Sequence, residues 1–156
     1  MPKPKISEEG KKKLRDSAKA ELERLEAIYA NDEVNQLLND FKDKYNLCES
    51  VYKVILAEHQ KVKGHKETDY LKVTMKQVPY ALKFAGYDFD KALLKELFGE
   101  KSTKGKTVKK LRDAVTHGID SKAVQEITDR KAELFGYMDT FLSEIRDFDA
   151  AACPVS

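Results

Sequence analysis

A hydrophobic stripe in the first third of the chain is the feature that most restricts its fold. From residue 34 to residue 56, apolar side chains recur at intervals of three or four residues, which is more than about six helical turns. This spacing is typical of a long helix that buries one face in a bundle. The stripe consists of Val34, Leu37, Leu38, Phe41, Tyr45, Cys48, Tyr52, Ile55 and Leu56.

The same period predicts further helices on both sides of this one. Asn31 or Asp32 is expected to cap the long helix, and Asp88 or Asp90 to cap a short one. The other helices are predicted over residues 14–29, 68–85 with a kink or restart at Pro79, 108–117, and 121–148 with Ser121 as the N-cap.

No run of alternating apolar and polar residues predicts a strand. The predicted fold class is therefore all-α, an up-and-down bundle of about five to six helices. With 156 residues, the chain has the length of one domain. We expect a flexible basic arm over residues 1–13, one helical domain over 14–149 and a loose tail over 150–156.

Composition narrows the classes of function. Hydrophobic residues make up 41% and charged residues 36%, but the net charge is only +2, so affinity for nucleic acid has to come from local clusters. Cys48 and Cys153 are too few and too far apart for a disulfide framework or a zinc site, and we expect no metal and no cofactor. No export signal or membrane-spanning segment is evident, which makes a cytoplasmic protein the default expectation.

A basic run precedes the helix predicted over residues 108–117. It places six cations within twelve residues, with no acid among them. Such a run creates a local positive field that favours contacts with RNA phosphates. The alternative is an ordinary solvated loop ahead of a helix. The run consists of Lys101, Lys104, Lys106, Lys109, Lys110 and Arg112.

The same helix carries residues suited to work on a phosphodiester. Imidazole exchanges protons near neutral pH, and a guanidinium holds phosphate oxygens in a bidentate fork. Asp113 lies one turn before His117, where its carboxylate could orient the imidazole ring. Arg112 and His117 are about 140° apart around the helix. The two side chains could bind the same small group only if a second copy of the chain contributes or the last turn of the helix opens.

The segment from Arg112 to His117, RDAVTH, resembles the signature of HEPN domains, in which Arg and a polar residue are followed by three residues and His. The helix ahead, the following Gly118 and the helix that begins SKAVQEITD are also similar to that family, over about residues 30–148. The resemblance implies an all-α homodimer that cleaves single-stranded RNA without a metal and leaves a cyclic phosphate. The resemblance implies that His117 is the general acid or base and that Arg112 holds the phosphate. It also implies that Asp113 orients His117 or supports the dimer.

Two alternatives stay open at the sequence level. The chain could be a non-catalytic helical module that binds RNA or a protein partner, with His117 as an ordinary C-terminal cap and Arg112 as a surface residue that pairs with acids. The family also includes toxins and phage-defence effectors, so an antitoxin or regulatory partner is a further expectation. Some of these toxins carry a Tyr two residues after the His, where a partner modifies it, but this chain has Ile119 there.

Overall fold

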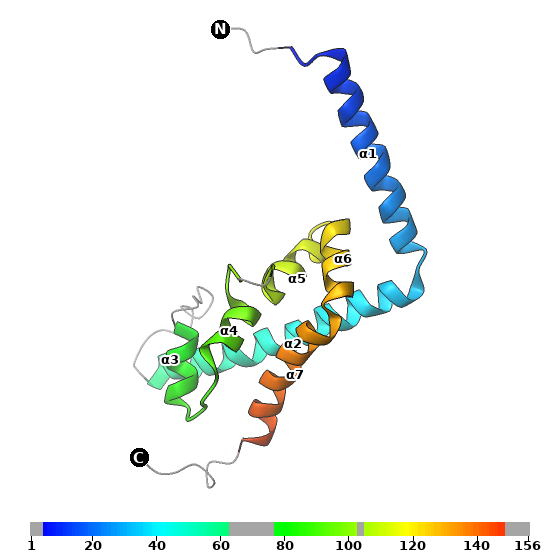
Figure 1. The fold of residues 1–156 in the computed structure, drawn as a ribbon. Coiled ribbons are helices and arrows are strands. Elements are labelled where there is room, and N and C mark those ends of the chain that lie inside the picture. Colours follow the sequence, from blue (N-terminus) through cyan, green and yellow to red (C-terminus); the bar gives the residue numbers. More distant parts are fainter. Residues whose placement is uncertain (1–4, 63–76, 103–104, 149–156) are drawn as a thin grey trace.

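The computed structural model describes residues 5–62, 77–102 and 105–148. Seven helices and no strand occur in these ranges, which confirms the all-α fold class (Figure 1). The helices are α1 (Glu8–Tyr29), α2 (Asp32–Val62), α3 (Gln77–Phe84), α4 (Lys91–Phe98), α5 (Val108–Thr116), α6 (Ser121–Asp129) and α7 (Lys131–Asp147).

Helix α2 is the axis of the fold, and the other helices pack against it or against each other (Figure 1). Its predicted stripe is buried: the side chains of Phe41, Tyr45 and Cys48 are fully inaccessible to solvent. Asn31 caps the helix, because its Oδ1 accepts a hydrogen bond of 3.1 Å from the N–H of Val34. The core is completed by Leu94, Leu97, Phe98, Val108, Leu111, Ile127, Leu134, Met138 and Phe141.

Helix α1 begins six residues earlier than the sequence predicted. The Ser7 hydroxyl accepts a hydrogen bond of 3.0 Å from the N–H of Gly10, so residues 8–13 belong to α1 and not to a flexible arm. None of its 22 residues is buried, and its N-terminal part projects beyond the other helices (Figure 1). Leu14 and Leu22, two of the apolar residues whose spacing predicts this helix, are exposed.

The segment that leads to the candidate site consists of α3 and α4. Gly86, with a φ of 99°, follows α3, and Asp90 caps α4, as the sequence predicted. Pro79 lies in the first turn of α3, where proline is tolerated. The predicted helix start near residue 68 lies outside the described residues.

One continuous last helix was predicted, but the structure has two. Arg130 adopts a φ of −103° and a ψ of 17°, and its guanidinium reaches the carbonyl of Lys106 and the carboxylates of Glu126 and Glu133. This connection breaks the helix into α6 and α7 and holds the loop before α5. The N-cap of α6 is Asp120, not Ser121, because its carboxylate accepts from the N–H of Lys122.

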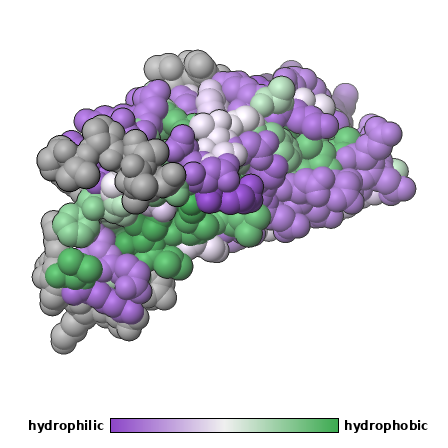
Figure 2. All heavy atoms as spheres, turned by 90° about the horizontal axis from the view of Figure 1, so that it is seen from below, coloured by the Kyte–Doolittle hydropathy of each residue, from purple (hydrophilic) through white to green (hydrophobic). Residues whose placement is uncertain are grey.

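The surface is not uniformly polar. Figure 2, which views the molecule from below, shows apolar surface between polar margins. Exposed large apolar side chains occur on α1 and α2, for example Leu14, Leu22, Leu47 and Val54, each more than half exposed. No helix among the described residues combines the length and the apolar character needed to cross a membrane.

Candidate functional site

Helix α5 is fixed by its cap and by its apolar face. The hydroxyl of buried Thr107 donates to the carbonyl of Gly99 at 2.8 Å and accepts from the N–H of Lys110 at 3.3 Å. Val108, Leu111 and Val115 are buried, as their spacing predicted. Their burial leaves the charged side chains of α5 on its other sides, where Arg112 reaches α2.

Arg112 projects from α5 onto α2. Its Nη2 donates to the Glu49 carboxylate at 3.1 Å, its Nη1 to the Asn46 side-chain oxygen at 2.9 Å, and its Nε to the Asp113 carboxylate at 2.9 Å. The guanidinium carbon also lies 4.6 Å from the centre of the Tyr45 ring. Only 18% of the side chain is exposed, so Arg112 is more buried than the alternative reading expected, but it pairs with acids as that reading expected.

The charges around Arg112 balance one another. Burial alone would raise the pKa of Glu49, but the Lys53 ammonium and the Arg112 guanidinium outweigh it and hold that pKa below its usual value. Burial, assisted by the neighbouring Tyr52 and Glu49, raises the pKa of Tyr45. The cluster is therefore an ion-pair network at the α2–α5 interface.

In the described part of the chain, no hydrogen bond joins the side chains of Asp113 and His117. The Asp113 carboxylate accepts from Arg112 instead. His117 is the C-cap of α5: its backbone N–H donates to the carbonyl of Asp113 at 3.3 Å. Its side chain is exposed, and no described residue forms a hydrogen bond with the imidazole. Gly118 follows with a φ of 135°, which ends the helix and turns the chain toward α6.

The predicted basic run is only partly available to a ligand. Lys109 and Lys110 form ion pairs with the two oxygens of Glu100, at 2.8 and 2.6 Å. Hydrogen bonds from Lys109 and then Lys110 lower the pKa of Glu100 to about 2. Lys101 and Lys106 are exposed, and Lys104 lies outside the described residues.

Sequence reasoning did not find Asn46, Glu49 and Glu100 as members of this region. Glu100 stands immediately before the basic run, so its proximity was the available signal. For Glu49 the signal was weaker: a carboxylate on α2 directly beside the buried stripe residue Cys48. A helix rotation of about 100° per residue then places it at the edge of the core, where a cation from another helix can reach it.

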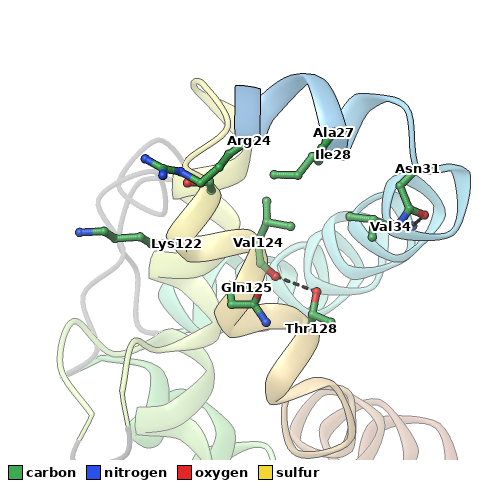
Figure 3. A pocket seen from close by; sticks show the side chains of 10 residues that line it. Arg24, Ala27, Ile28, Asn31, Val34, Lys122, Val124, Gln125 and Thr128 are labelled. Carbon is green, nitrogen blue, oxygen red and sulfur yellow. Dashed lines mark hydrogen bonds between the residues drawn. The ribbon is translucent and has the colours of Figure 1, made fainter. Parts of the chain in front are cut away.

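A separate apolar groove of about 650 Å³ opens between α1, the start of α2 and α6 (Figure 3). Ile28, Val34 and Val124 form its apolar wall, and Arg24 and Lys122 extend toward the same side of it. It shares no residue with the Arg112 cluster. Within the ranges that the structure describes, no group of three or more His, Cys, Asp or Glu is arranged to hold a metal ion.

Comparison with known proteins adds no relative. No protein-family model matches this chain, and neither a curated protein nor a solved structure matches it. The function therefore has to be argued from the residues themselves.

Proposed function

We propose that this protein is a HEPN-like, metal-independent endoribonuclease that cuts single-stranded RNA at a site completed by two copies of the chain. The observation that carries the proposal is the contrast between Arg112 and His117. Arg112 is held in place by α2, and His117 stands exposed at the end of the same helix with no described hydrogen-bond partner for its imidazole.

The residual hydrogen-bonding capacity of Arg112 supports a role at a phosphate. A guanidinium has five N–H groups, and the contacts to Glu49, Asn46 and Asp113 use three of them. One N–H on each terminal nitrogen remains, and a phosphate oxygen accepts from such donors. Because its other donors are already satisfied, Arg112 loses little conformational freedom when it binds an oxyanion.

Two copies of His117 would supply the proton transfers. The ribose 2′-oxygen forms a bond to phosphorus while the bond from phosphorus to the 5′-oxygen breaks. One imidazole takes the proton of the 2′-hydroxyl, and the protonated imidazole of the other copy gives its proton to the departing 5′-oxygen. The products are a 2′,3′-cyclic phosphate and a 5′-hydroxyl. Exposure of His117 is what permits both rings to reach one RNA strand.

The experiment is a cleavage assay on single-stranded RNA in excess chelator, with the product ends identified. We expect cleavage by the wild type and a loss of about 100-fold or more in His117→Ala. His59→Gln is the matched control, because His59 is on α2 and packs on Phe84. Cleavage that requires an added divalent cation would overturn the proposal.

A second candidate function is a non-catalytic module that binds RNA or a protein partner. The ion pair of Arg112 with Glu49 and the position of His117 as the C-cap of α5 favour it, because both residues then have structural roles that need no catalysis. RNA binding in fluorescence anisotropy without any cleavage by the wild type would select this function. Toxicity on overexpression that a co-expressed partner relieves would instead favour a toxin or phage-defence effector.

A further inference from the structure

Helix α1 presents an apolar stripe that is largely exposed to solvent. The side chains of Leu14, Leu22 and Tyr29 are 62%, 55% and 60% exposed. With a rotation of about 100° per residue, these three and Ala18 lie within about 80° of arc. The stripe extends over fifteen residue steps, or about 22 Å. A projecting helix with a continuous apolar side is a surface for a partner.

The remainder of the fold holds α1 by another side. The carboxylate of Glu21 accepts from the backbone N–H of Ser121 at 3.2 Å and from its hydroxyl at 2.8 Å. Ile28 lines the groove toward α6. Both residues lie about 60–80° around the helix from the middle of the stripe. The contacts that anchor α1 therefore leave most of the stripe available, although Leu25 within its arc is half-buried.

Charge along α1 is divided between its two halves. Residues 11–19 contain five cations and one acid, whereas residues 20–27 contain three acids and one cation. If two α1 helices pack antiparallel, the basic half of each lies beside the acidic half of the other, which is favourable. If they pack parallel, halves of like charge lie side by side. The cations are Lys11, Lys12, Lys13, Arg15 and Lys19, and the acids of the second half are Glu21, Glu23 and Glu26.

We propose that α1 pairs in antiparallel orientation with α1 of a second copy of this chain, across a two-fold axis near Leu22. In this register Leu14 packs on Tyr29 of the other copy, and Ala18 packs opposite Leu25. Arg15, Lys19 and Glu26 lie on the same side of the apolar stripe. In the antiparallel pair this side is shared by the two helices, so Arg15 and Lys19 lie beside Glu26 of the other copy. Such an interface is self-complementary, as a two-fold dimer requires.

This pairing is independent of the proposed ribonuclease activity, but it has a consequence for the region of His117. Because Glu21 binds Ser121, the first residue of α6 is held on α1 within one residue of the axis. The loops that carry His117 in the two copies would thus lie at the middle of the assembly. The interface is short, so we expect a dissociation constant on the order of 10 µM.

Sedimentation equilibrium of the full chain tests the pairing. We expect twice the monomer mass at high concentration, and a dissociation constant raised at least about 100-fold in Leu14→Glu/Leu22→Glu. Both positions are exposed in the single chain, so the variant should keep the wild-type circular dichroism. Leu47→Glu/Val54→Glu, equally exposed on α2, is the matched control and should still dimerise. A wild-type monomer at 100 µM, or a dimer that survives the α1 substitutions, would overturn the proposal.

Single cysteines distinguish the orientation. In a Cys153→Ser background, Leu22→Cys should oxidise to a disulfide-linked dimer, because position 22 lies next to its own copy at the axis. Leu14→Cys should remain monomeric on a denaturing gel, since the two copies of residue 14 are about 22 Å apart in the antiparallel register. Efficient cross-linking at position 14 and none at position 22 would contradict the antiparallel arrangement. Cleavage of RNA plays no part in either readout.

Discussion

The guanidinium of Arg112 donates to the carboxylate of Glu49 at 3.1 Å, and both side chains are about four-fifths buried. The bond joins α5 to α2 across 63 positions of the sequence. Arg112 is therefore a structural tie of the bundle as well as a residue proposed to hold phosphate. Loss of activity in an Arg112 variant has to be separated from loss of fold.

Replacing Arg112 with Ala should lower the free energy of unfolding by about 2–3 kcal/mol. The substitution leaves the Glu49 carboxylate partly buried without its guanidinium, and it removes the contact with the Tyr45 ring. Urea denaturation measures the change. Arg146→Ala, an exposed arginine near the end of α7, is the matched control and should change stability by less than about 0.5 kcal/mol.

Urea denaturation of the Arg112→Ala/Glu49→Gln double variant tests whether the unpaired Glu49 carboxylate causes this destabilisation. If the unpaired carboxylate causes the destabilisation, the double variant should be more stable than the sum of the two single changes predicts. Strict additivity would show that the ion pair is not coupled in solution.

Acid should weaken the fold through Glu49. Its folded-state pKa lies below the value of 4.5 for an unperturbed carboxyl, so its stabilising contribution is complete above about pH 4.5. That contribution is lost as pH falls from there through the folded-state pKa, because the unfolded chain binds the proton first. The stability difference between wild type and Glu49→Gln should therefore shrink between pH 6 and pH 3 in urea titrations. A difference that is constant over this range would be inconsistent with the lowered pKa.

Two glycines should respond in opposite directions to substitution by Ala. A Cβ at Gly118 or at Gly136 would meet no atom within 4 Å, so space is available at both. Gly118 has a φ of 135°, and Ala there should cost about 1–2 kcal/mol of backbone strain. Gly136 lies inside α7, and Ala there should stabilise by about 0.5–1 kcal/mol. Thermal melts of the two variants provide the comparison; a stabilising Gly118→Ala would rule out the left-handed turn after His117.

Cys48 should resist alkylation until the protein unfolds. Burial raises the pKa of its thiol to about 12, so almost no thiolate is present at pH 8, and the side chain is inaccessible. In Cys153→Ser, the rate of labelling by iodoacetamide should follow the unfolded fraction as urea is raised. Rapid labelling in buffer alone would mean that the α2–α7 core opens locally.

The helices could be predicted because the period of apolar residues depends on the chain alone. The stripe on α2, the caps Asn31 and Asp90, and the stop at Gly118 all follow from neighbours within four residues. The apolar stripe of α1 was misjudged for the same reason. Periodicity shows that one side is apolar, but it does not show whether another helix is present to cover it.

The site was less predictable because its contacts are distant in sequence. Local spacing suggested that Asp113 serves His117, whereas the structure pairs Asp113 with Arg112 after Glu49 and Asn46 have fixed the guanidinium. The break at Arg130 also depends on a remote group, the carbonyl of Lys106. Which polar side chains pair depends on which helices pack together, and the apolar period within one helix carries no information about its neighbours.

Whether His117 is catalytic can be decided by measuring the single-turnover rate of RNA cleavage by His117→Ala together with its melting temperature. His117 is exposed and has no described side-chain hydrogen bond, so the account predicts an unchanged melting temperature together with a rate at least about 100-fold below wild type. A His117→Ala protein that melts as the wild type does and cleaves RNA at the wild-type rate would contradict it.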